Sequence, residues 1–266
     1  MGILVEKDEE RSELGRRISA DLRERAERGE ITYTAFLSPA ELHRLGRALP
    51  CKDAFLQSGG YAAAERARIF FLPPYLAEGD ETLREECLAE CFAEVLIPLE
   101  IVGSGFRALT HRDYLGAILN LGLERDAIGD LCVPEPHRAI TFCDRVIADF
   151  LKEHLTRVAN DAVRVRECML PPDFDGGRQF AAITDTVASE RTDCIVAALA
   201  NLSRERALAI LREGLVEVDF EPAERPDKPI AEGSVIVIRG KGKFIIRSLS
   251  QQTKKGRLRL VADQYL

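Results

Sequence analysis

The amino-acid sequence predicts a multidomain protein of the α+β class, and three observations lead to this prediction. The chain has 266 residues, which is enough for two or three domains. Residues 94–169 alternate between strand-like and helix-like segments in a regular order. Residues 185–266 have the pattern of two short helices followed by strands, and they include a strongly basic segment.

An α/β unit is expected at the N-terminus, over residues 1–90. Helices are expected at residues 12–30 and 38–50, and strands are expected at residues 54–57 and 68–72. Ser38 and Pro39 begin the second helix, because serine is a common N-cap residue and proline is favoured at the first helical position.

A middle domain is expected over residues 91–170. Its expected elements follow the order strand-helix-strand-strand-helix-strand, at residues 95–102, 111–123, 128–133, 138–143, 145–158 and 162–168. This order is typical of ferredoxin-like and RRM-like βαββαβ domains. Pro98 falls in a strand that would be central, where proline is poorly tolerated. Residues 138–143 lack the aromatic side chains on which an RRM stacks bases, so a conventional RRM binding face is not expected.

The C-terminal domain is expected over residues 185–266, after a linker at residues 171–184 that contains Pro171-Pro-Asp-Phe-Asp-Gly-Gly177. Ser203 is the expected N-cap of the second helix, and Gly214 is expected to end that helix. The β-branched run Val235-Ile-Val-Ile238 predicts a strand that leads into the basic segment.

The charge distribution points to an anionic partner for this C-terminal domain. Residues 239–260 hold eight Lys or Arg and no Asp or Glu, although the whole chain has a formal net charge of −7. Residues 185–266 have 14 basic and 12 acidic side chains, a net charge of +2, whereas residues 1–184 have 23 and 32, a net charge of −9. A basic segment on an acidic protein repels itself unless it binds an anion, and RNA is such an anion.

The same domain resembles the S4 RNA-binding domain. The motifs that match occur in the family's order, as Arg191-Thr-Asp193, Ser203-Arg-Glu-Arg-Ala207, Gly214, Val216-Glu-Val218 and Glu232-Gly-Ser234. Asp219-Phe220 and Ser234 depart from the family pattern around one β-turn. The resemblance implies that the paired helices and an adjacent loop bind structured RNA through its phosphates and shape.

Complete catalytic and cofactor signatures are missing from the sequence. His111-Arg112-Asp113 matches part of the kinase catalytic loop, but Ile118 stands where that loop needs asparagine. No dinucleotide-binding or phosphate-loop fingerprint is complete, and the seven scattered cysteines have no zinc-site spacing. We therefore expect no enzyme activity, no catalytic residues, no cofactor, no metal and no small-molecule substrate.

The sequence also predicts a cytoplasmic location. It contains no run of 18 apolar residues that would span a membrane, and its first residues lack the features of a secretory signal. An odd number of cysteines without a disulfide framework is typical of free thiols in a reducing compartment.

Nearly the full length of the chain resembles the YlmH family. The motifs that match are Phe36-Leu-Ser-Pro-Ala-Glu41, Gly59-Gly-Tyr-Ala-Ala-Ala-Glu-Arg66, Leu109-Thr-His-Arg-Asp-Tyr-Leu-Gly116, Ile128-Gly-Asp130 and Thr253-Lys-Lys-Gly-Arg257. The resemblance implies a bacterial, non-catalytic RNA-binding protein of the large ribosomal subunit. It implies 23S rRNA and tRNA as partners, and a role at stalled peptidyl-tRNA complexes. Two alternatives stay open: an RNA-modifying enzyme targeted by its S4 domain, or an adaptor in ribosome assembly or cell division.

The candidate RNA-binding residues come from these patterns. Thr110 and Asp113 are explained as a helix capping box, which leaves His111 and Arg112 at an exposed helix N-terminus that favours phosphate. The full set of candidates is Arg66, His111, Arg112, Arg191, Ser203, Arg204, Arg206, Lys228, Arg239, Lys241, Lys243, Lys254, Lys255 and Arg257. We expect Arg191, Arg204 and Arg206 to form one face with part of the basic segment.

Overall fold

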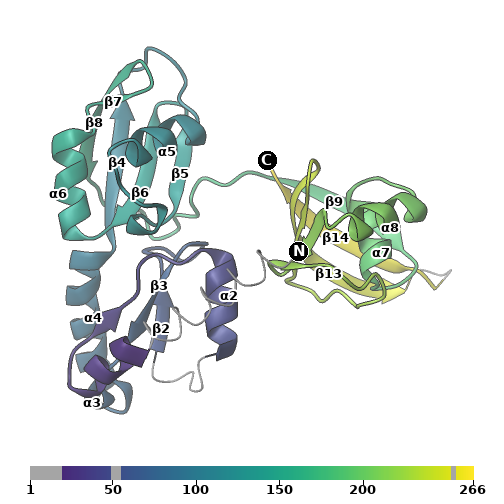
Figure 1. The fold of residues 1–266 in the computed structure, drawn as a ribbon, viewed down its shortest axis with the longest axis horizontal. Coiled ribbons are helices and arrows are strands. Elements are labelled where there is room, and N and C mark those ends of the chain that lie inside the picture. Colours follow the sequence, from purple (N-terminus) through teal and green to yellow (C-terminus); the bar gives the residue numbers. More distant parts are fainter. Residues whose placement is uncertain (1–19, 49–54, 253–255) are drawn as a thin grey trace. The chain divides into compact units, whose positions relative to one another are not determined.

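The computed structural model describes residues 20–48, 55–252 and 256–266. The chain forms two compact units, residues 1–177 and residues 178–266. The described residues are of mixed α/β structure, with three β-sheets (Figure 1). Two of these sheets lie in the first unit and one lies in the second.

The first unit begins with a small sheet of three antiparallel strands in the order β1-β3-β2. The strands are β1 (Thr32–Tyr33), β2 (Phe55–Ser58) and β3 (Arg68–Phe71). Helix α2 (Pro39–Ala48) follows Ser38, whose hydroxyl group accepts a hydrogen bond from the backbone N–H of Glu41. The expected helix and both expected strands are thus confirmed in their described residues, whereas β1 was not expected. Residues 20–27 are helical, and the part of the predicted first helix before residue 20 lies outside the described residues.

Two helices that the sequence did not predict connect this sheet to the next. They are α3 (Pro74–Ala77) and α4 (Glu81–Val95). The carboxylate of Asp80 starts α4 by accepting hydrogen bonds from the backbone N–H groups of Thr82 and Leu83, at 2.8 and 3.2 Å. The buried residue of α4 is Val95, so the helix lacks the broad apolar stripe by which a sequence reveals a packed helix.

The second sheet of this unit has five antiparallel strands in the order β5-β6-β4-β8-β7. The strands are β4 (Ile97–Gly103), β5 (Leu131–Glu135), β6 (Arg138–Cys143), β7 (Arg157–Val158) and β8 (Asp161–Glu167). The helices are α5 (His111–Leu119), the short 3₁₀ helix η1 (Arg125–Ala127) and α6 (Arg145–His154). Apolar side chains of α5 and α6, among them Tyr114 and Leu151, pack with Leu99 and Ile101 of β4 on one face of the sheet.

The predicted order of elements is present here, with corrections at several ends. Helix α5 stops at Leu119 instead of residue 123, because Gly122 adopts a left-handed conformation with φ of +89°. The predicted helix 145–158 stops at His154, and its last two residues form β7 instead. The strand predicted at 128–133 begins later, at Leu131.

Pro98 is tolerated in the central strand because of its place near the strand's beginning. The Pro98 carbonyl accepts a hydrogen bond from the backbone N–H of Cys168 at 3.1 Å, so this residue's backbone polar groups point toward β8. Residue pairing between β4 and β8 starts only at Leu99. The N–H that proline lacks would therefore face the end of the ladder, where its loss costs little.

The opposite face of the five-stranded sheet packs within the first unit. Ile140 and Phe142 of β6 belong to one buried cluster with Phe36, Phe70 and Leu96. This cluster joins the two sheets, and the boundary expected near residue 90 falls inside α4. Phe174, in the stretch expected to be a linker, contacts Tyr61 with ring centroids 5.1 Å apart.

The second unit is one antiparallel sheet with a pair of helices on one face (Figure 1). Its strand order is β11-β10-β12-β13-β14-β9. The elements are β9 (Phe180–Val187), α7 (Thr192–Leu199), α8 (Arg204–Arg212), β10 (Val216–Val218), β11 (Glu221–Pro222), β12 (Val235–Ile238), β13 (Gly242–Gln252) and β14 (Leu258–Tyr265). Strand β9 begins at Phe180, inside the range expected to be a linker. Ile195, Ile210, Ile236, Phe244 and Leu260 are among the residues of its core.

Candidate nucleic-acid interface

A buried carboxylate ties together the beginnings of α7 and α8. The Asp193 side chain has no exposed surface and accepts hydrogen bonds from the guanidinium groups of Arg191 and Arg204. Arg191 donates through Nε and Nη2 at 3.0 and 3.1 Å, and Arg204 donates through Nε at 2.9 Å. The two arginine side chains are 41% and 59% exposed, so both reach the surface next to each other.

This arrangement keeps Asp193 ionised. Burial opposes the negative charge, but the hydrogen bonds from Arg191 and Arg204 outweigh it and lower the pKa of Asp193 to about 2. One negative charge therefore offsets part of the positive charge of the two arginines. The sequence predicts Arg191 and Arg204 only as RNA contacts, whereas the structure gives both of them a structural role as well.

Two further candidates lie close to these arginines. The backbone N–H and the hydroxyl group of Thr192 both donate to the carbonyl of Lys228, at 2.9 and 2.8 Å, so the exposed Lys228 is held beside the start of α7. Arg206 is exposed in the first turn of α8. Ser203 is the N-cap of that helix, because its hydroxyl group accepts a hydrogen bond from the backbone N–H of Arg206 at 3.2 Å.

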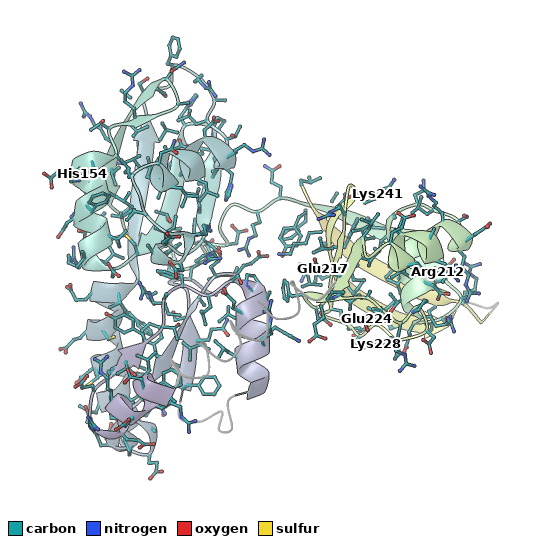
Figure 2. The ribbon with its side chains drawn as sticks, viewed as in Figure 1. His154, Arg212, Glu217, Glu224, Lys228 and Lys241 are labelled. Carbon is teal, nitrogen blue, oxygen red and sulfur yellow. The ribbon has the colours of Figure 1, made fainter. Side chains whose placement is uncertain are left out.

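The described part of the basic segment lies at a different place in the second unit. Arg239 and Lys241 are exposed at the tight turn between β12 and β13. Figure 2 shows Lys228 and Lys241 on opposite sides of this unit. Lys228 and Lys241 thus lie apart in this view, and the shared face expected for Arg191, Arg204, Arg206 and part of the basic segment stays a prediction. Lys254 and Lys255 lie outside the described residues.

The first unit brings two of the recognised sequence motifs together around Asp130. Its carboxylate accepts hydrogen bonds from the Tyr61 hydroxyl group at 2.6 Å, and from the backbone N–H groups of Glu65 and Arg66 at 2.8 and 3.0 Å. Asp130 is buried. The stretch from Gly59 to Arg66 is therefore fastened to the sheet by a residue more than sixty positions later in the chain.

Arg66 and His111, both candidates, lie around a residue that the sequence analysis missed. Arg125 donates from Nη1 to the carbonyls of Ile128 and Gly129, at 2.9 and 2.8 Å. Burial and the nearby charge of Arg66 lower the pKa of Arg125 to about 10. Burial and Arg125 also lower the pKa of His111, so its imidazole is neutral at physiological pH. Arg125 belongs to no motif, and its neighbourhood arises only from folding.

A groove lies beside the N-terminal turn of α5. It has a volume of about 510 Å³, and its polar lining is Arg112, Asp113, Asn120, His154, Thr156 and Arg157. Gly116 also lines this groove. His154, labelled in Figure 2, belongs to α6. The capping box predicted for α5 is confirmed, since Thr110 and Asp113 exchange both hydrogen bonds.

The remaining face of the five-stranded sheet does not offer an aromatic surface to bases. Part of it is covered by the cluster around Phe142. On another part, the buried Glu100 binds Arg138 and Arg166 of the neighbouring strands. This agrees with the expectation that the sheet is not a conventional RRM binding face.

The structure describes residues 20–48, 55–252 and 256–266 of the chain. No group of three or more His, Cys, Asp or Glu side chains in these residues is arranged to hold a metal ion. The helices of the same residues include none that is long and apolar enough to cross a membrane.

Comparisons with known proteins agree with the recognised motifs. Residues 94–171 match the family model described as "Putative RNA-binding domain in YlmH". The chain is 28% identical to the "Ribosome-associated protein quality control protein P2" of Bacillus subtilis (strain 168), over 90% of this chain and 89% of that protein. Among solved structures, the "Cell division protein ylmH from Streptococcus pneumoniae" matches with a TM-score of 0.45 and 19% identity. That match covers 61% of this chain and 92% of the other.

Proposed function

We propose that the chain is a YlmH-type RNA-binding protein and acts as a non-catalytic, cytoplasmic protein of bacterial ribosome quality control. In this proposal, the chain binds the large ribosomal subunit and contacts 23S rRNA and tRNA of stalled complexes. The relative from Bacillus subtilis supports this proposal, since it is named as a ribosome-associated quality control protein and aligns with nearly the whole chain.

We propose that residues 185–266 are an S4 domain and that the start of its helix pair is the main RNA contact. The observation that carries this proposal is the Arg191–Asp193–Arg204 group. A buried carboxylate holds two exposed guanidinium groups side by side, so they lose little conformational entropy when they bind phosphate. The exposed Arg206 and Lys228 extend this positive surface.

The middle region is proposed to add a second contact through its helices. The strand order β5-β6-β4-β8 supports a ferredoxin-like domain. Its sheet is partly covered, so the proposed contact is the groove lined by Arg112 and Arg157, with His111 nearby at the N-terminus of α5. Unpaired N–H groups at this end favour a phosphate anion.

Sedimentation of ribosomes from cells that make a tagged chain tests the proposal. The chain is expected in the large-subunit fractions, and RNA crosslinked to it is expected to contain 23S rRNA and tRNA. Arg206→Glu with Lys228→Glu should shift the chain to the top of the gradient. The matched control is Arg25→Glu with Arg28→Glu, which changes the net charge equally at exposed arginines of the first unit. Equal cosedimentation of both double variants would contradict the proposed surface.

A further inference from the structure

The sheet of the second unit has one face that α7 and α8 do not cover. Core residues such as Phe244, Ile246, Leu260 and Ala262 point to the helices. Because side chains alternate along strands, their neighbours in sequence point to the other face. On the three strands β13, β14 and β9, that open face carries Lys243, Ile245, Arg247, Arg259, Val261, Asp263, Tyr265, Phe180, Ala182, Thr184 and Thr186.

Two aromatic rings and two cations meet at one edge of this open face. Phe180 and Tyr265 are paired across β9 and β14, and their ring centroids are 4.9 Å apart in an edge-to-face arrangement. The ammonium group of Lys243 lies 4.4 Å from the Tyr265 ring centroid, and the guanidinium carbon of Arg247 lies 5.7 Å from that of Phe180. Phe180 is 38% exposed, although it is a large apolar residue.

From this arrangement we infer that the open sheet face binds unpaired RNA nucleotides, with Phe180 and Tyr265 as a stacking surface. Aromatic side chains bind single-stranded bases of any sequence by stacking, and neighbouring cations hold the phosphates. Lys243 and Arg247 supply these cations, and Asp263 orients Arg247 through an ion pair of 2.7 Å. The hydroxyl groups of Thr184 and Thr186 offer further polar contacts on the same face.

The charge of this face favours RNA over a protein partner. The cations lie beside the rings themselves, so a stacked base would bring its own phosphates next to Lys243 and Arg247. A purely apolar partner would instead have to desolvate these charges. The inference rests on the proposed RNA-binding function, but it concerns a different surface and a different kind of RNA from the helix pair.

The test compares two RNAs with the full chain by fluorescence anisotropy. One RNA is a uridine octamer that cannot form base pairs, and the other is a stable hairpin. Phe180→Leu with Tyr265→Leu keeps apolar bulk and net charge but removes both rings. We expect this variant to bind the octamer about fivefold more weakly or worse, since stacking of bases on aromatic rings contributes much of the affinity for single-stranded RNA. Hairpin binding should change less than about twofold.

A control and a second measurement make each outcome decisive. Tyr75→Leu removes an exposed aromatic ring of the first unit and should leave both affinities unchanged. If the double variant binds the octamer as tightly as the parent chain does, the inference is overturned and the proposed function stands. Failure of the parent chain to bind either RNA would overturn both. If the double variant fails to fold, ultraviolet crosslinking of the octamer to the parent chain decides. Crosslinks at Phe180 or Tyr265 support the inference, and crosslinks elsewhere alone overturn it.

Discussion

Replacing Asp193 with asparagine should destabilise the second unit and release its two arginines from each other. The pKa of Asp193 is about 2 in the folded chain, against 3.8 for an unperturbed aspartate. A difference of this size corresponds to about 2 kcal/mol of stability, because one pKa unit is worth ~1.4 kcal/mol. Since Arg191 and Arg204 are partly exposed, solvent screening reduces the expected loss to ~1–2 kcal/mol.

The sign of the pH dependence follows from the direction of this pKa shift. The folded-state pKa is lowered, so the stabilisation is fully present above about pH 4 and is lost as the pH falls toward 2. The parent chain should therefore be more stable than Asp193→Asn above about pH 4, and this difference in stability should shrink as the pH falls toward 2. Arg204→Ala should likewise destabilise the second unit, because that substitution leaves Asp193 buried with only one arginine partner.

Urea unfolding can be monitored through the amide NMR signals of the second unit. The stability of this unit is then measured separately from that of the first unit. Parent and variant are compared at pH 7, pH 4 and pH 2.5. Asp227→Asn serves as the control, since Asp227 forms an exposed ion pair with Arg225 and should contribute little. Equal urea midpoints for the parent and Asp193→Asn at pH 7 would refute the reasoning. A difference that persists unchanged at pH 2.5 would refute it too.

Five other expectations concern RNA binding, local stability and chemistry. Binding of structured RNA should weaken with salt along a log–log slope of about −4, as expected for roughly five neutralised phosphates, and a flat response would contradict the phosphate contacts. Thr110→Ala should cost about 1 kcal/mol in thermal unfolding through loss of the α5 cap. By contrast, His111→Ala with Arg112→Ala should weaken ribosome binding with little change in stability. Asp130→Ala should destabilise the first unit by about 2 kcal/mol, measured by urea unfolding, because it leaves two part-buried N–H groups and a hydroxyl group without their acceptor. Mass spectrometry of rRNA and tRNA should show the same modifications in cells with and without the chain, and a modification restored by purified protein would instead favour an enzyme.

Features that depend on residues close together in the chain could be predicted from the sequence. Thr110 and Ser203 start α5 and α8 as expected, since a capping hydrogen bond spans only two or three positions along the chain. Gly214 follows α8 with a φ of +68°, a conformation that glycine adopts without strain. Strand β6 has the predicted limits, because its apolar run and its flanking turns are both local signals.

The tertiary structure alone decided the features that join distant parts of the chain. Tyr61 and Asp130, 69 positions apart, form one hydrogen-bonded group, and Asp193 binds an arginine 11 positions away. The pairing of Phe180 with Tyr265 likewise depends on the register of β9 against β14. Helix α4 escaped detection because its packing does not produce an apolar stripe. Sequence periodicity reports which face of an element is buried, whereas the partner that buries it is set by the way the elements pack together.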